Sequence, residues 1–258
     1  MATRHQSFAQ LHSLRPANTG MLRLLLIASA TALRLATKWS AVIVDTRFDP
    51  GVVASITNAR RHLPAYVPIF LMTRDANRAA ATSLFAQYRN VRLAERRHEA
   101  SDVASYNALL TSTAFWEQFD GDEYVLIFQS DSRFCSGGNQ TMLDFVGRWD
   151  YIGAPWETAA RGLGTRVGNG GFSLRSRQLM LDCIRTRKRS WYHEDVFFAL
   201  CAKDRGARVP SPEVAASFAV EMYRPAGVLP MAVHKSWHYI HDDLALARHC
   251  PEGVRLVC

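Results

Sequence analysis

The sequence lacks several features that would place it in a specialised class of protein. No apolar run approaches the roughly 18 residues that a membrane-spanning helix needs, so we expect no transmembrane span. No two cysteines lie within four residues of one another, which argues against a CxxC metal or redox site. Their odd number, five, gives little support to a full disulfide framework. With 48% apolar and 21% charged residues, the composition is globular, which excludes disordered, collagenous and coiled-coil proteins.

Acidic residues are missing from residues 1–40. This segment carries five of the net eight positive charges, so residues 41–258 are only mildly basic. Its apolar run, Leu24–Leu33, is too short to span a bilayer but fits the core of a signal peptide, and the acid-poor composition also fits an organelle transit peptide. A plain tail before an ordinary helix is the third interpretation. Localisation therefore stays open between the cytoplasm, a secretory (Golgi-like) route and an organelle.

From residue 41 onward, apolar β-rich runs alternate with helical patterns, and no internal repeat is visible. We expect strands at 41–47, 66–72, 91–93 and 124–129, and helices at 50–63, 76–88, 103–119, 141–145, 178–185, 196–203 and 214–222. Asp49 and Asp75 are the expected caps of the first two helices. This alternation predicts an α/β sandwich with a largely parallel sheet, which binds ligands beyond the carboxyl ends of its strands.

The first candidate site follows the strand at 124–129, which is hydrophobic on both faces and therefore suits the centre of a covered sheet. Gln129 and Asp131 are two residues apart, so both side chains project to the same side. A carboxylate in this place is costly unless it is solvated or coordinated, and it could hold a divalent cation against a diphosphate. The alternative is an Asx turn that Asp131 forms locally.

A glycine-rich segment, Gly168-Asn169-Gly170-Gly171, gives the second candidate site. Glycines let a ligand approach the backbone, and the Asn169 amide could bond a hydroxyl. A tight turn before a strand explains the glycines equally well. Upstream, Trp156 follows a probable strand and could stack on a sugar ring, although a role in the core is the more common one for tryptophan.

Two further motifs carry ionisable side chains. Glu194 and Asp195 stand where a helix would begin, either as capping acids or as a base that takes a proton from an attacking hydroxyl. His234 emerges from a short apolar run and could supply an imidazole to a metal, although a lone histidine is more often an ordinary surface or hydrogen-bonded residue. Lys235 beside it could meet a phosphate. The short basic run at 185–189 is typical of a solvated helix end, so we expect no nucleic-acid partner.

Taken together and in order, the strings YVLIFQSDSRFCS, DYIGAPW, VGNGGFSLRSR, HEDVFF and HKSW resemble an uncharacterised domain family that is held to be related to GT-A glycosyltransferases. The early AVIVDTR strand and the YNALLTSTAFWEQF helix also fit this family. The resemblance covers residues 40–240 and implies a GT-A-like (nucleotide-diphospho-sugar transferase) α/β/α sandwich with a mixed, mostly parallel central sheet. We expect a basic N-terminal segment at 1–40 and a single such domain at 41–258.

The resemblance also implies roles for individual residues. GT-A enzymes hold Mn²⁺ or Mg²⁺ on the donor diphosphate with an acid-x-acid motif, whose place is taken here by Gln129-Ser130-Asp131. The first acid is replaced, which puts metal dependence in doubt. Asp131 and His234 are then the expected metal ligands, and Asp195 or Glu194 the expected base. The remaining expected contacts are Asp45, Thr46, Arg47, Gln129, Ser130 and Lys235 for the donor nucleotide, and Trp156, Asn169, Gly170 and Gly171 for the sugar or acceptor.

The resemblance thus implies a hexosyl- or pentosyltransferase that moves a sugar from a nucleotide-diphosphate donor to a hydroxyl of an unknown glycan, protein or lipid acceptor. An acid that takes the acceptor proton corresponds to an inverting reaction, whereas a retaining enzyme would not need this base, and the sequence does not decide between the two. The alternative is a non-catalytic relative that binds a nucleotide sugar or a carbohydrate, and the degenerate acid motif is its best support.

Overall fold

The structure is a computed structural model that describes residues 37–95, 98–99, 102–158, 164–188, 193–240 and 243–253. The expectations for residues 1–36, including the apolar run Leu24–Leu33, lie outside the described residues. Residues 37–258 cluster as one compact unit, and the account below concerns the described part of that unit.

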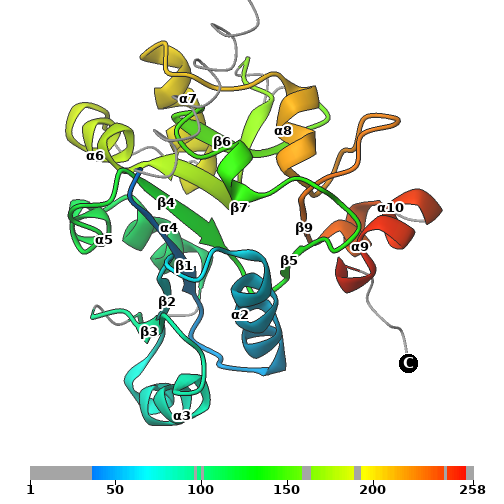
Figure 1. Ribbon diagram of the computed structural model, residues 1–258. Coiled ribbons are helices and arrows are strands. Elements are labelled where there is room, and N and C mark those ends of the chain that lie inside the picture. The colour runs from blue at the N-terminus through cyan, green and yellow to red at the C-terminus, as the bar shows by residue number, and fades with distance from the viewer. Residues whose placement is uncertain are drawn as a thin grey trace, which may run out of the picture. The chain divides into compact units, whose positions relative to one another are not determined.

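A six-stranded sheet forms the centre of the fold, in the order β3-β2-β1-β4-β7-β6 (Figure 1). Strands β3, β2, β1 and β4 are parallel, whereas β7 runs antiparallel to both β4 and β6. Their bounds are Trp39–Val44 (β1), Ile69–Met72 (β2), Val91–Leu93 (β3), Tyr124–Phe128 (β4), Tyr151–Pro155 (β6) and Val167–Ser176 (β7). The mixed, mostly parallel α/β sheet predicted from the sequence is confirmed.

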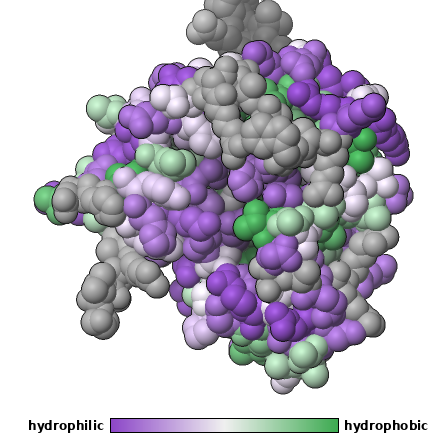
Figure 2. All heavy atoms as spheres, turned by 180° about the vertical axis from the view of Figure 1, so that it is seen from behind, coloured by the Kyte–Doolittle hydropathy of each residue, from purple (hydrophilic) through white to green (hydrophobic). Residues whose placement is uncertain are grey.

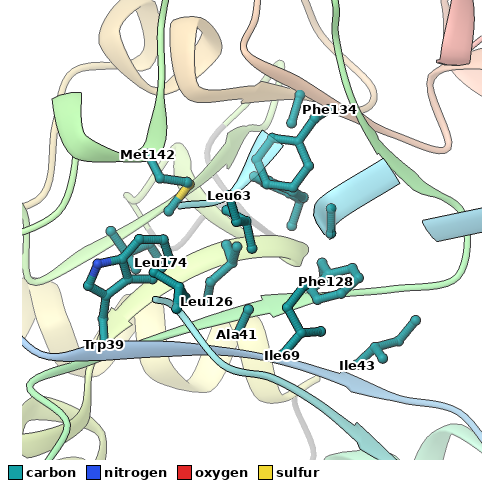
Figure 3. Packing of buried hydrophobic residues seen from close by; sticks show 14 of the residues in the cluster. Trp39, Ala41, Ile43, Leu63, Ile69, Leu126, Phe128, Phe134, Met142 and Leu174 are labelled. Carbon is teal, nitrogen blue, oxygen red and sulfur yellow. The ribbon is translucent and has the colours of Figure 1, made fainter. Parts of the chain in front are cut away.

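Alternate residues of the central strands pack on opposite faces of the sheet, as the two-residue period of a strand requires. On β4, Leu126 and Phe128 belong to one hydrophobic cluster, while Val125 and Ile127 belong to another. Figure 3 shows the first cluster, in which Leu126 and Phe128 pack with Leu63, Phe134 and other apolar side chains. A strand buried on both faces explains the uninterrupted apolar run in the sequence.

Helices cover both faces of the sheet. Helix α2 contributes to the first cluster, and α5 and α7 contribute to the second. The helices are α2 (Pro50–His62), α3 (Asp75–Phe85), α4 (Val103–Leu110), α5 (Thr113–Glu117), α6 (Arg177–Thr186), α7 (Glu194–Asp204), α8 (Pro212–Phe218), α9 (Ser236–Tyr239) and α10 (Leu244–His249), with 3-10 turns η1 (Met142–Asp144) and η3 (Pro251–Gly253).

The local capping signals are partly confirmed. Asp49 caps α2 and accepts a hydrogen bond from the Val52 backbone at 3.1 Å. Asp75 is instead the first residue of α3, with Arg74 at the cap position. The single helix expected over 103–119 is two helices, because Ser112 leaves the helical conformation and its side chain caps α5.

A second, three-stranded sheet has the order β5-β9-β8, with bounds Ser132–Phe134 (β5), Ala219–Val220 (β8) and Ala232–His234 (β9). Strand β5 follows β4 after a short turn and pairs antiparallel with β9. The helix expected over 214–222 is too long, since α8 ends at Phe218 and the next two residues form β8. Figure 1 shows β5 and β9 beside α9 and α10.

Two disulfides were not expected from the odd cysteine count. Cys135 pairs with Cys250, and Cys183 pairs with Cys201. The first joins β5 to the end of α10, and the second joins α6 to α7. Disulfides persist in oxidising compartments.

The surface agrees with a globular domain. Figure 2 shows that the face seen there is mainly hydrophilic, with small hydrophobic patches between the polar side chains. Among the described residues, no helix combines the length and the apolar character that crossing a bilayer requires.

Candidate active site

A cavity of about 800 Å³ lies beyond the carboxyl ends of β1 and β4. Its lining includes the end of β1, the turn after β4, the glycines of β7, the start of α7, one side of α4 and the end of β9. The predicted residues that line it are Asp45, Thr46, Arg47, Gln129, Ser130, Asp131, Asn169, Gly170, Gly171, Glu194, Asp195, His234 and Lys235. The structure therefore brings together almost every site residue expected from the sequence.

Trp156 is the exception, because it is not among the residues that line the cavity. Its side chain is half-buried and packs against Val196 and Leu200 of α7. This apolar packing accounts for part of the Trp156 surface, and the expected contact with a sugar stays a prediction.

The turn after β4 is fixed by hydrogen bonds to β7. The Gln129 amide donates to the Gly171 carbonyl at 3.0 Å, and the Ser132 hydroxyl donates to the same carbonyl at 2.9 Å. The Ser132 amide in turn donates to the Gln129 carbonyl at 3.0 Å. These bonds close a tight turn that directs the side chains of Gln129 and Asp131 into the cavity.

Strand pairing explains how Asp131 meets a histidine far along the chain. Ser132 of β5 is the register partner of His234 of β9, so the residue before Ser132 lies beside the end of β9. Asp131 Oδ1 is 3.1 Å from His234 Nε2, and Lys235 Nζ is 3.6 Å from Asp131 Oδ2. Burial opposes ionisation of Asp131, but His234 and Lys235 outweigh it and lower the pKa of Asp131.

A glycine is required where β7 passes this pair. A Cβ on Gly171 would lie 1.9 Å from the His234 ring, far inside van der Waals contact. The ring therefore rests directly on the backbone of β7, which fixes its place in the cavity wall. The backbone of Lys235 next to it adopts a left-handed conformation with φ of 49°, an uncommon state for a residue with a side chain.

Glu221 is a buried carboxylate of this site that the sequence did not reveal. Its Oε1 lies 3.4 Å from His234 Nδ1, and its Oε2 accepts a hydrogen bond from the Asn169 amide. His234 is thus held between two carboxylates, one on each ring nitrogen. Burial opposes the imidazolium charge, but hydrogen bonds to Asp131 and Glu221 outweigh it and raise the pKa of His234.

The end of β1 carries a second charged group. Arg47 contacts Asp45 through its Nε at 3.1 Å and its Nη2 at 2.7 Å, and its Nη2 also donates to the Ser130 hydroxyl at 2.8 Å. Burial works against the Asp45 charge, but these bonds lower the pKa of Asp45 overall. The guanidinium is 60% exposed, so it faces the open part of the cavity.

The two neighbouring acids at the start of α7 have different surroundings. Both oxygens of Glu194 accept hydrogen bonds from Arg175, whose side chain is fully buried. Asp195 forms no ion pair with the described residues and instead accepts from the backbone amides of Gly170 at 3.2 Å and Val196 at 2.7 Å. Burial and the adjacent Glu194 charge raise the pKa of Asp195 to about 6. Asp195, rather than Glu194, is therefore the carboxylate suited to exchange a proton.

One side of α4 also lines the cavity and was not singled out from the sequence. Asn107 Oδ1 accepts a hydrogen bond from the Glu194 amide at 3.0 Å and so fixes the start of α7. Tyr106, one residue earlier, faces the cavity with a buried hydroxyl. In the sequence both residues open the helical string YNALLTSTAFWEQF, which fits the family but gives neither residue a role in the site.

The fold type makes a divalent cation the expected cofactor, so we asked whether the side chains suit one. Asp131 Oδ1 is buried and lies 3.1 Å from His234 Nε2, while Gln129 Oε1 lies 3.0 Å from the same nitrogen. A carboxylate oxygen, an imidazole nitrogen and an amide oxygen thus converge, and Mn²⁺ or Mg²⁺ accepts such donors. No group of three or more His, Cys, Asp or Glu side chains within the described ranges is arranged to hold a metal.

Comparisons with known proteins place this geometry in a wider context. The family described as "Protein of unknown function (DUF5672)" matches residues 88–234, more than half of the chain. The comparison with curated proteins returned no match.

Two solved structures show the fold. The apo form of the glycosyltransferase GlyE from Streptococcus pneumoniae TIGR4 is similar with a TM-score of 0.50 at 14% identity, covering 77% of this chain and 54% of that one. The apo structure of the bifunctional glycosyltransferase WbbM gives 0.51 at 14%, covering 78% and 46%. The chain thus spans about half the length of these proteins. At such identity the likeness concerns the fold, which is that of GT-A-like glycosyltransferases.

Proposed function

The chain belongs to the DUF5672 family, and from that premise and its GT-A-like fold we propose that it transfers a sugar from a nucleotide-diphosphate donor to an acceptor hydroxyl. One observation carries the proposal. Asp131 and His234, about a hundred residues apart, meet within 3.1 Å on the wall of an 800 Å³ cavity, and Asp195 stands on the same wall. A phosphate-binding group and a base in one cavity are what this reaction needs.

The charges within the cavity suit a donor diphosphate. Arg47, after β1, and Lys235, after β9, line the cavity with side chains that are 60% and 38% exposed. Partly exposed cations can turn towards a bound anion at little cost. Asp131 and His234, with the Gln129 amide oxygen, would hold a Mn²⁺ or Mg²⁺ ion, which supplies charge neutralisation for the departing diphosphate.

Asp195 supplies the proton chemistry in this proposal. At neutral pH a carboxyl with a pKa of about 6 is mainly ionised, yet it is a stronger base than an ordinary aspartate. It accepts the proton of the attacking acceptor hydroxyl as the new glycosidic bond forms and the bond to the diphosphate breaks. A base in this role corresponds to an inverting reaction. Glu194, neutralised by Arg175, holds the start of α7 in place.

A non-catalytic binding relative is the second candidate function. Its support is Gln129, which stands where GT-A enzymes carry a first acid and which leaves only two ionisable metal ligands. Such a protein would bind a nucleotide sugar without consuming it, so donor turnover separates the two candidates.

The first experiment is a thermal-shift panel of UDP, GDP, UDP-glucose and GDP-mannose, each with and without Mn²⁺. A ligand at 100 times its Kd stabilises the native state by about 2.7 kcal/mol, which raises Tm by several degrees. We expect a shift with at least one nucleotide, larger with Mn²⁺, followed by slow release of the nucleoside diphosphate from its sugar conjugate. A panel without any shift would contradict the proposal, and binding without release would favour the non-catalytic candidate.

A further inference from the structure

Tyr106 of α4 carries a hydroxyl that the protein itself leaves unused. The hydroxyl oxygen is buried and makes no hydrogen bond to any described residue, although the Gln129 side chain lies beside it. The ring packs against the second hydrophobic cluster of the core, while the residue lines the cavity. A buried hydroxyl without a partner costs stability, so it is rare in a native structure unless a ligand supplies the partner.

The location of Tyr106 identifies what that ligand is. Gln129, beside the Tyr106 hydroxyl, reaches His234 Nε2 at 3.0 Å, where the proposed function has the donor diphosphate bound. Asp195, the proposed base, lines the same cavity. In the proposed reaction, the group that lies between the diphosphate and the base is the sugar being transferred.

The chemistry of the hydroxyl narrows the choice further. A tyrosine hydroxyl has one O–H group, which it can donate to an acceptor on a bound molecule. Its counterpart is an uncharged oxygen with a free lone pair, which a sugar hydroxyl provides and which the carboxylate-lined wall does not repel.

We infer that the Tyr106 hydroxyl binds the transferred sugar by donating a hydrogen bond to one of its oxygen atoms. The inference rests on the proposed function and adds to it a residue that distinguishes the sugar from the nucleotide. Tyr106 is a binding residue here, since proton transfer remains with Asp195.

Tyr106→Phe tests this inference because it removes only the unpartnered hydroxyl. In the free protein the variant should keep its Tm or gain up to about 4 °C, since no protein hydrogen bond is lost. Its affinity for the sugar conjugate, UDP-glucose or GDP-mannose, should fall about 3- to 10-fold by calorimetry, the effect of one neutral hydrogen bond. Its affinity for the matching diphosphate, UDP or GDP, should be unchanged.

Tyr124→Phe is the matched control. The Tyr124 hydroxyl accepts a hydrogen bond from Arg208 at 3.2 Å and lies outside the cavity lining. This variant should lower Tm slightly and leave both affinities unchanged, the reverse of the pattern for Tyr106→Phe.

The possible results are distinct. A lower Tm for Tyr106→Phe would show that the hydroxyl has a structural partner, and equal affinities for the sugar conjugate in wild type and variant would show that it does not touch the sugar. Either overturns the inference while the proposed function stands. If the wild-type protein binds neither the diphosphates nor their conjugates, the proposed function fails, and the inference fails with it.

Discussion

The two sides of the cavity are built differently. On the β1 side, the Arg47 side chain is 60% exposed and pairs with Asp45, which is two residues away and only 8% exposed. On the β9 side, His234 and Glu221 are only 4% and 7% exposed, and their contacts join segments far apart in the chain. Exposed ion pairs are weak and easily rearranged, whereas buried ones are rigid and costly to break. The β1 side therefore suits contacts that adapt to a ligand, and the β9 side suits exact placement of reacting groups.

The largest effect on the rate of sugar transfer is expected at Asp195. Asp195→Asn keeps the shape of the side chain but removes the base, so kcat should fall about 10²- to 10⁴-fold while donor binding changes little. Asp102→Asn is the control, because Asp102 also lines the cavity and asparagine caps a helix as well as aspartate does. Initial rates of sugar transfer measure both. Comparable rates in Asp195→Asn and wild type would remove Asp195 as the base.

On the β9 side, Glu221→Gln keeps a hydrogen-bonding group beside His234 but removes the charge. If Asp131 and His234 hold a cation, Mn²⁺ affinity should fall about 10- to 100-fold, as is usual when the group that orients a histidine ligand is altered. Calorimetric titration with Mn²⁺ measures this. Glu252→Gln, a carboxylate outside this cavity, should bind Mn²⁺ as wild type does, and a matching loss there would point to a nonspecific effect.

The fall of kcat/KM at low pH should be smaller than the effects of the two substitutions above. Burial and the Glu194 charge raise the pKa of Asp195 to about 6, so the base form is lost as pH falls through this value. Below pH 6, kcat/KM should decline by about tenfold per pH unit. A profile that stays flat down to pH 5 would contradict this assignment, and the residual rate of Asp195→Asn should lack the step.

The smallest effect is expected on the β1 side. Arg47→Ala removes a half-exposed ion pair and leaves the Asp45 carboxylate, which is only 8% exposed, without its cation, so the free energy of unfolding should fall by about 1 to 3 kcal/mol. Donor affinity should fall by a few fold, and the loss should shrink at high salt, which screens exposed charges. A salt series of UDP or GDP binding measures this. A loss of donor affinity that high salt does not reduce would contradict the distinction between the two sides.

The sequence predicted the parallel part of the fold well because its signals are local. The apolar run at Tyr124–Phe128 and the cap at Asp49 each depend on neighbouring residues, and both are confirmed. The site residues at strand ends follow from the same reasoning, since the carboxyl ends of parallel strands share one edge of the sheet.

Other features depend on partners distant in sequence and could not be predicted. Glu221 matters because β8 and β9 pair, a contact that no local pattern marks. The Tyr106 hydroxyl can be recognised as unpartnered only in the folded structure, where the side chains around the cavity are in place. The partner of Cys135, 115 residues away, is equally hidden in the sequence, and a count of cysteines does not reveal it.

The most direct test of the account is a Mn²⁺ titration in the presence of UDP or GDP, for wild type, Asp131→Ala and His234→Ala. We predict that wild type binds the ion together with the nucleotide, and that each variant weakens this binding at least tenfold while circular dichroism shows an intact fold. If both folded variants bind Mn²⁺ and the nucleotide with wild-type affinity, Asp131 and His234 do not hold the metal–nucleotide pair. That result would contradict sugar transfer at this site.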